Sequence, residues 1–190
     1  MAASAVLKKK WDHVFHTFFD MNKNEKIDWN DFELLFEKIK ECRGEDSTEY
    51  KIASDAMLAV WKGLLNTTKG LDLAKEAPAD ATVTIEEWEK VWLQFNPDHI
   101  PPWQREYIKY MFFLLDSSGD KFIDVKEFTS VMGLYGVSKA AAEKSFAALC
   151  EVDGKKVDKL DYGQYMKLWN QFFTSKDAKA PGNALFGPLS

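Results

Sequence analysis

Hydrophobic residues recur along the chain with the helical spacing i, i+3, i+4 and i+7, and this pattern occurs four times. Every one of its positions is apolar or aromatic, which predicts four helices that each bury one wide hydrophobic stripe. The stripes are Phe32, Leu35, Phe36 and Ile39; Trp88, Val91, Trp92 and Phe95; Phe128, Val131, Met132 and Tyr135; and Tyr162, Tyr165, Met166 and Trp169. The pattern indicates an all-α protein.

A β-branched residue lies five positions before each stripe, at Ile27, Val83, Ile123 and Val157. Ile27 and Ile123 each follow a polar segment, and each polar segment follows another apolar stripe. The incoming stripes are Val14, Phe15, Phe18 and Phe19, and Ile108, Met111, Phe112 and Leu115. The repeating unit is therefore a helix, a polar loop and a second helix. We expect neighbouring loops to pair in short β-bridges, Ile27 with Val83 and Ile123 with Val157.

Three prolines near the middle of the chain divide the four repeats into two pairs. Pro97, Pro101 and Pro102 interrupt any helix across this stretch. The predicted organisation is an N-terminal pair over residues 1–96, a linker over residues 97–102, and a C-terminal pair over residues 103–173.

Two further segments read as irregular. Residues 66–81 contain Gly and Pro and few large apolar residues, which predicts a long loop inside the second repeat. Residues 174–190 form a tail in which Leu185, Phe186 and Leu189 are apolar. We expect this tail to pack on the body of the protein.

The amino-acid composition argues against a disordered protein and against a nucleic-acid-binding one. The chain has 190 residues, of which 46% are hydrophobic, with 7 Trp, 6 Tyr and 14 Phe, and this excludes disorder over most of its length. Such a length allows one compact domain or two small halves. The 30 acidic residues exceed the 25 basic ones, and no basic run exceeds the triplet Lys8, Lys9, Lys10. These features argue against nucleic acid as a partner.

The chain also lacks the marks of export and of membrane insertion. Two cysteines are too few for a disulfide framework, and they form no Cys-x-x-Cys pair. The first eleven residues reverse the order of a signal peptide, and Ala2 stands where myristoylation needs Gly. No run approaches the ~18 apolar residues of a membrane span. We expect a cytoplasmic monomer without a transmembrane segment.

Two of the polar loops carry the donors of a calcium site. Ca²⁺ takes about six to eight oxygens, and a twelve-residue loop offers them from positions 1, 3, 5, 7, 9 and 12, with position 7 using its main-chain carbonyl. The first loop, residues 20–31, and the third, residues 116–127, have oxygen donors at every position. These are Asp20, Asn22, Asn24, Lys26, Asp28 and Asp31, and Asp116, Ser118, Asp120, Phe122, Asp124 and Glu127. The predicted ligand is Ca²⁺, with Mg²⁺ competing.

Together the loops, their flanking stripes and the fourfold repetition resemble the EF-hand superfamily. The tryptophans of the outgoing helices, the Asp31 ending of the first loop and the closing segment Gly182-Asn-Ala-Leu-Phe-Gly-Pro-Leu189 are similar to invertebrate sarcoplasmic calcium-binding proteins and to calexcitin. The resemblance implies two EF-hand pairs with β-bridges between paired loops, and reversible calcium binding.

The first and third loops depart from the usual pattern at two positions. Position 6 usually holds Gly because its φ is positive, but here it holds Glu25 or Lys121, at a cost of roughly 1 kcal/mol each. We expect this strain to be nearly equal in the two loops. At position 12, Asp31 is one methylene shorter than Glu127, which predicts that the first loop tolerates Mg²⁺ better.

The other two loops are degenerate. The second, residues 76–87, has Glu76, Pro78, Asp80, Thr82, Thr84 and Glu87 at the ligand positions, and Pro78 supplies no side-chain oxygen. Whether it binds calcium stays open. Aligned on Val157, the fourth loop covers residues 150–161 and places Cys150, Val152 and Gly154 at positions 1, 3 and 5. We expect this loop to be purely structural.

The first functional hypothesis is a calcium buffer, because an aromatic-rich core resists opening. The alternative is a sensor of calexcitin type that acts on a channel or another protein target. A third possibility is light emission, since coelenterazine-oxidising photoproteins resemble the same architecture. Those proteins use His with Tyr and Trp, and here no His follows His99. The chain has no recognisable catalytic residues and no nucleotide-binding loop, so we expect no enzyme.

Overall fold

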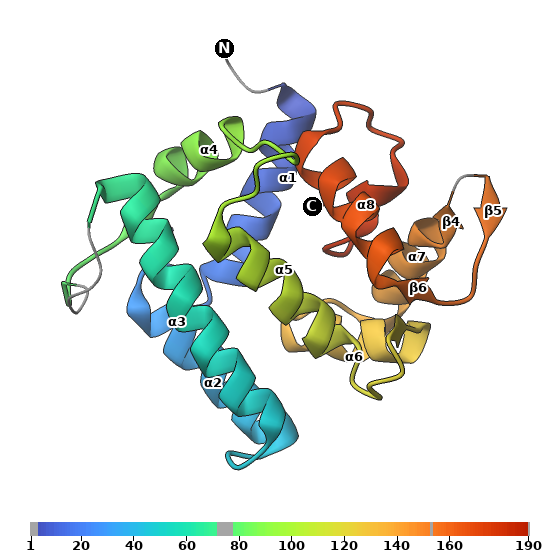
Figure 1. Cartoon of the computed structure of the whole chain (residues 1–190), viewed down its shortest axis with the longest axis horizontal. Coiled ribbons are helices and arrows are strands. Elements are labelled where there is room, and N and C mark those ends of the chain that lie inside the picture. Colours follow the sequence, from blue (N-terminus) through green and yellow to red (C-terminus); the bar gives the residue numbers. More distant parts are fainter. Residues whose placement is uncertain (1–3, 72–77, 153, 190) are drawn as a thin grey trace. The chain divides into compact units, whose positions relative to one another are not determined.

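The computed structural model describes residues 4–71, 78–152 and 154–189. This part of the chain forms eight α-helices joined by short antiparallel strands, which confirms the predicted all-α class (Figure 1). The chain divides into two compact units, one of residues 14–110 and one of residues 1–13 together with residues 111–190. None of the described helices combines the length and the apolar composition that a membrane crossing requires.

The unit of residues 14–110 contains the first two repeats. Its elements are the π-helical turn η1 (Phe15–Phe19), β1 (Lys26–Ile27), α2 (Trp29–Arg43), α3 (Thr48–Lys69), β2 (Val83–Thr84), α4 (Ile85–Leu93) and most of α5 (Pro102–Leu115). Strands β1 and β2 pair antiparallel, with Ile27 opposite Val83 as predicted. The pairing ties the first loop to the second.

Aromatic rings from several elements form the core of this unit. Trp88 of α4 is fully buried, and its ring lies against those of Phe15, Phe19 and Trp92 at centroid distances of 6.1, 4.7 and 5.3 Å. Such edge-to-face and tilted contacts add to the free energy gained by burying the rings. The first two predicted stripes are buried, except that their members Phe36 and Phe95 are half-buried.

Helix α3 extends into the segment predicted as a long loop, because it runs to Lys69. The hydroxyls of Thr67 and Thr68 donate to the carbonyls of Gly63 and Leu64, one turn back in the same helix. Gly70 then ends the helix with φ of 66°. The prediction of a loop over residues 66–81 was therefore wrong for its first four residues, and residues 72–77 lie outside the described part.

The other unit combines α1 (Ala5–Val14), except for its last residue, with the third and fourth repeats. Its further elements are the end of α5, β3 (Phe122–Ile123), α6 (Val125–Leu134), α7 (Lys139–Leu149), β4 (Glu151–Val152), β5 (Lys155–Lys156), β6 (Leu160–Asp161), α8 (Tyr162–Thr174) and the 3₁₀ turn η2 (Pro181–Ala184). Strands β4 and β5 form a small hairpin, while β6 pairs antiparallel with β3. The third stripe, beginning at Phe128, is buried as predicted.

The register predicted for the fourth repeat was wrong by three residues. Ile123 lies opposite Leu160, not opposite Val157. Counting from Leu160 as position 8 moves the fourth loop from residues 150–161 to residues 153–164. The fourth stripe moves with it, because Tyr162 is 42% exposed whereas Tyr165 is buried. The buried face of α8 carries Tyr165, Leu168, Trp169 and Phe172.

The C-terminal tail packs against α7 and α8 within the same unit. Leu185 and Phe186 are buried, and the Phe186 ring lies 5.4, 4.7 and 5.9 Å from the rings of Trp169, Phe172 and Phe173. A Cβ at Gly182 would lie 2.5 Å from the Leu168 carbonyl oxygen, so the tail backbone needs glycine to approach α8 this closely.

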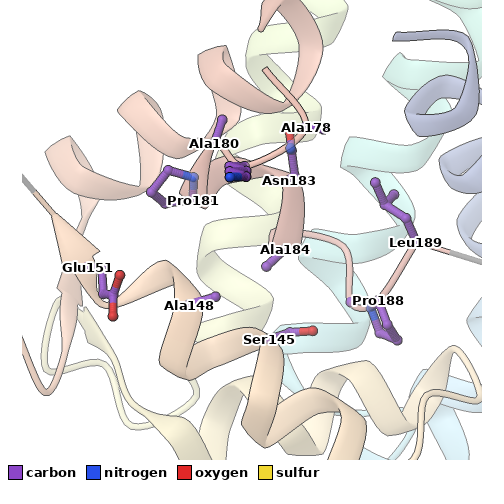
Figure 2. Close-up of a pocket in the computed structure, with 12 residues that line it drawn as sticks. Ser145, Ala148, Glu151, Ala178, Ala180, Pro181, Asn183, Ala184, Pro188 and Leu189 are labelled. Atoms are coloured by element: carbon purple, nitrogen blue, oxygen red, sulfur yellow. The ribbon is translucent and has the colours of Figure 1, made fainter. Parts of the chain in front are cut away.

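On its other side the tail borders a shallow pocket next to α7. Figure 2 shows small side chains lining it, among them Ser145 and Ala148 of α7 and Ala180 and Ala184 of the tail. Small side chains at these positions allow the tail and α7 to lie close to each other.

Two side chains of α1 hold the tail in place. Lys10 is fully buried, and its Nζ donates to the carbonyls of Ser175 and Gln171 and to Asn183 Oδ1 at 2.7, 3.3 and 3.1 Å. The first two acceptors lie at the C-terminus of α8, where a cation is favourable. His13 Nε2 donates to the Phe186 carbonyl at 2.8 Å, because a carbonyl only accepts.

The buried ammonium predicts a pH-dependent stability. Burial lowers the pKa of Lys10 from 10.5 to about 8, so the unfolded chain binds more protons between these pH values. The free energy of unfolding should therefore rise by on the order of 1–3 kcal/mol from pH 8 to pH 10.5, relative to a Lys10→Met variant. Denaturant unfolding of both proteins measures this, and a constant difference between them would contradict it.

Candidate metal-binding loops

The helix that follows each loop begins with the same local motif. An N-cap side chain accepts from the main chain of the first turn, and the side chain three residues later accepts from the N-cap N–H. The motif occupies positions 9 and 12 of every loop. The four pairs are Asp28 with Asp31, Thr84 with Glu87, Asp124 with Glu127, and Asp161 with Gln164. It orients the side chain at position 12 toward its own loop.

In the first loop the five predicted side-chain ligands are linked by hydrogen bonds. The two oxygens of Asp31 accept from the main-chain N–H groups of Asn22 and Asp28 at 3.0 and 2.8 Å. The amides of Asn22 and Asn24 donate to Asp28 at 3.5 and 2.9 Å. Asp20 Oδ1 accepts from the N–H of Asn24 at 3.0 Å. The loop therefore brings positions 1, 3, 5, 9 and 12 together.

This first loop concentrates negative charge away from water. Asp20 and Asp31 are each 1% exposed. Desolvation raises the pKa of Asp31, two main-chain hydrogen bonds oppose that rise, and the nearby charges of Asp28 and Asp20 add to it. Buried carboxylates of like charge require a compensating cation or a proton. The donor set of the loop thus fits a cation.

The third loop repeats the arrangement with a longer carboxylate. Glu127 Oε1 accepts from the N–H of Ser118 at 2.9 Å, and Oε2 accepts from the N–H of Asp124 at 2.9 Å. Position 12 therefore bridges positions 3 and 9 in both loops, despite the shorter side chain of Asp31. The Ser117 hydroxyl also donates to Glu127 Oε1, at 3.5 Å, whereas Oε2 keeps a second lone pair for another ligand.

The side chain at position 1 of the third loop also indicates a cation site. Asp116 Oδ2 accepts from the N–H of Lys121 at 3.1 Å. The other oxygen, Oδ1, is buried and has no hydrogen-bond partner in the part of the chain that the structure describes. A buried carboxylate oxygen left unpaired is costly, and a bound cation would satisfy it.

The tight turn of each loop has the expected backbone conformation at position 6. Glu25 and Lys121 have φ of 65° and 70°, and their N–H groups donate to the carboxylates of Asp20 and Asp116. The expectation of nearly equal strain was wrong, because position 4 also has positive φ. Lys23 takes that position in the first loop, with φ of 61°, whereas the third loop has Gly119 there. The first loop thus carries roughly 1 kcal/mol more strain.

In the second loop, the carboxylate at position 12 is paired with a lysine from a neighbouring helix. Glu87 forms an ion pair with Lys69 of α3, and its other oxygen accepts from the N–H of Thr84 at 3.0 Å. Desolvation alone would raise the pKa of Glu87, but the hydrogen bonds from Lys69 and Thr84 leave it lowered. Glu76 at position 1 lies outside the described residues, and Pro78 at position 3 brings no side-chain oxygen.

A lysine of the fourth loop contacts the third loop. Lys159 Nζ donates to Asp120 Oδ2 at 2.6 Å. The hydrogen bond raises the pKa of Lys159, as do the charges of Asp120, Asp124 and Glu127, and it lowers the pKa of Asp120. Sequence reasoning missed this residue because the register was wrong. The motif Asp161-x-x-Gln164, which repeats the position 9 and 12 pairs of the other loops, is the signal that reveals it.

The donor chemistry of both loops is dominated by oxygen. Over residues 4–71, 78–152 and 154–189, no three His, Cys, Asp or Glu side chains are arranged to hold a metal by themselves. Besides carboxylates, the first loop offers amide and main-chain oxygens, and the third offers a hydroxyl and main-chain oxygens. Such ligands suit Ca²⁺ and Mg²⁺ rather than zinc or copper.

Comparison with known proteins places these loops in context. No family model matches the chain. It is 29% identical to calexcitin-1 of Caenorhabditis elegans over 182 residues, which cover 95% of this chain and 86% of that protein. It is 28% identical to sarcoplasmic calcium-binding proteins I, III and IV of Branchiostoma lanceolatum over 183 residues, which cover 95% of each. The chain is a homologue of calexcitin and of the sarcoplasmic calcium-binding proteins.

A solved structure supports the same relationship. The sarcoplasmic calcium-binding protein of amphioxus matches with a TM-score of 0.74 and 25% identity, covering 97% of this chain and 98% of that one. The chain therefore has the EF-hand fold, as the resemblance implied. Two of these three relatives bear the name of calcium-binding proteins and none that of an enzyme.

Proposed function

We propose that this protein binds Ca²⁺ reversibly through the loops of residues 20–31 and 116–127, and that it acts as a cytoplasmic calcium buffer. The observation that carries the proposal is the hydrogen-bond pattern shared by the two loops. In each, the position 6 N–H donates to the position 1 carboxylate, and the position 12 carboxylate bridges positions 3 and 9. Calcium-binding homologues of nearly full length support it.

The ligands would be the donors named from the sequence. In the first loop they are the side chains of Asp20, Asn22, Asn24, Asp28 and Asp31 and the carbonyl of Lys26. In the third they are the side chains of Asp116, Ser118, Asp120, Asp124 and Glu127 and the carbonyl of Phe122. A bound Ca²⁺ would compensate the charge of these carboxylates, of which Asp20, Asp31 and Glu127 are buried.

The buffer role is favoured over the sensor role by the packing of the tail. A sensor exposes an apolar groove when its helix pairs open. Here Leu185 and Phe186 of the tail cover apolar side chains of α8, and Lys10 and His13 hold that tail. Binding would order the loops without exposing a large apolar surface.

Three measurements test this function. A calorimetric titration should give two bound Ca²⁺ per chain, and no binding would refute the proposal. The fluorescence of an apolar dye should change little on addition of Ca²⁺, whereas a large increase would indicate a sensor that acts on a protein target. In an ¹⁵N NMR titration, the amides of Glu25 and Lys121 report on the first and third loops separately, because each donates to a ligand carboxylate.

Position 12 should set the ion preference of the first loop. Asp31→Glu lengthens the carboxylate and lets it offer both oxygens, which suits the larger shell of Ca²⁺. We expect the Mg²⁺ concentration needed to displace Ca²⁺ there to rise on the order of tenfold, as followed on the Glu25 amide. The Lys121 amide is the internal control and should titrate unchanged. Equal Mg²⁺ competition in the variant and the natural protein would show that position 12 does not set selectivity.

A further inference from the structure

The carboxylate at position 5 of the third loop is held from outside its own loop. Asp120 Oδ2 accepts from Lys159 Nζ at 2.6 Å, and Oδ1 accepts from the N–H of Phe122 at 2.9 Å. In the first loop the equivalent Asn24 contacts Asp28 of the same loop at 2.9 Å. The side chain at position 5 is therefore contacted by a cation from the fourth loop in the third loop, but by a carboxylate of its own loop in the first.

The strand pairing explains how Lys159 reaches this carboxylate. Strand β6 pairs with β3 so that Leu160 faces Ile123 and Asp161 faces Phe122. Lys159 directly precedes β6, and the capping box of Asp161 and Gln164 anchors the other end of that strand to α8. The β-bridge therefore directs the Lys159 ammonium toward the third loop.

The fourth loop is otherwise poor in anionic donors. In the observed register positions 1 and 9 hold Asp153 and Asp161, but positions 3, 5 and 7 hold Lys155, Val157 and Lys159, and position 12 holds the neutral Gln164. In an EF-hand pair with two ion sites, the fourth loop would bind the second ion. Here it instead contributes the Lys159 ammonium to the third loop.

We propose that Lys159 is a built-in counter-cation of the third loop, which neutralises Asp120 in the absence of a divalent ion and competes with that ion for the carboxylate. This inference rests on the proposed calcium binding at residues 116–127. Calcium must displace the ammonium from Asp120 before this carboxylate can act as a ligand. The affinity of the third loop is therefore lower than its own donors would give.

The test is a calcium titration of the full-length protein and its Lys159→Gln variant, followed by ¹⁵N NMR on the Lys121 amide. Removal of the competing charge should tighten Ca²⁺ binding at the third loop roughly two- to fivefold, the range expected for an exposed ion pair. The Glu25 amide should show no change in the first loop. Lys159→Arg keeps the charge and should keep the affinity of the natural protein.

Two further variants separate this role from general electrostatics. Lys156→Gln removes an equal charge from the exposed strand β5 of the same loop and should leave the affinity unchanged. In an Asp120→Asn background, Lys159→Gln should no longer tighten binding, because the pair is already broken. An unchanged or weaker affinity in Lys159→Gln overturns the proposal, as does an equal gain in Lys156→Gln or a gain that persists with Asp120→Asn.

The same titration distinguishes failure of this inference from failure of the proposed function. If the Lys121 amide of the natural protein does not respond to Ca²⁺, calcium binding at the third loop fails, and the role of Lys159 fails with it. If that amide responds and Lys159→Gln leaves the affinity unchanged, the loop binds calcium and only the role of Lys159 is refuted.

Discussion

Glu127→Gln should weaken Ca²⁺ binding at the third loop by roughly 30-fold or more, because losing one partner of a buried charge pair costs about 2–5 kcal/mol. Glu127 is 8% exposed and directs both oxygens into the loop. The variant should keep its fold, since Gln164 already forms the same capping box at the start of α8. The measurement is the Ca²⁺ titration of the Lys121 amide.

A matched control is available on α7. Glu143 is exposed and pairs across one helical turn with Lys139 at 3.8 Å. Glu143→Gln makes the same chemical change away from the loops and should leave both calcium affinities unaltered. If Glu127→Gln binds Ca²⁺ at the third loop as tightly as the natural protein, Glu127 is not a ligand.

Phe186→Ala should lower the free energy of unfolding by about 3–5 kcal/mol, the usual cost of removing a buried phenyl ring. Phe186 is 1% exposed and contacts three aromatic rings of α8. Its loss leaves a cavity between the tail and that helix. Denaturant unfolding in the presence of a chelator measures the effect without a contribution from bound calcium.

Phe122→Ala is the matched control for this change, because Phe122 lies in the same unit but is 43% exposed. Its substitution should cost about 1 kcal/mol or less. Equal destabilisation by the two variants would mean that the tail contributes no buried core.

The polar loops of residues 20–31 and 116–127 were the part of the molecule most easily predicted from the sequence. Donor spacing within twelve residues and the apolar stripes on either side are local patterns, and the fold keeps them because each stripe must be buried. The bridge of Ile27 with Val83 follows for the same reason. The positive φ of Lys23 at position 4 does not follow from donor spacing, because position 4 supplies no ligand and its conformation is set by the turn of the loop.

Two overlapping apolar stripes made the buried face of α8 ambiguous in the sequence. Tyr162, Tyr165, Met166 and Trp169 fit the helical spacing as well as Tyr165, Leu168, Trp169 and Phe172 do. Periodicity alone cannot choose between two registers that both satisfy it. The pairing of β6 with β3 made the choice, since it sets Leu160 opposite Ile123.

The helical repeats and the polar loops of residues 20–31 and 116–127 can be predicted from the sequence alone, because these patterns depend on residues close together in the chain. Tertiary structure decided the register of the fourth loop, the burial of Lys10 under the tail and the contact of Lys159 with Asp120. Lys10 and Lys159 read as ordinary solvated lysines until the fold brings distant acceptors to them. Desolvation and ion pairing depend on such neighbours, which no local spacing specifies.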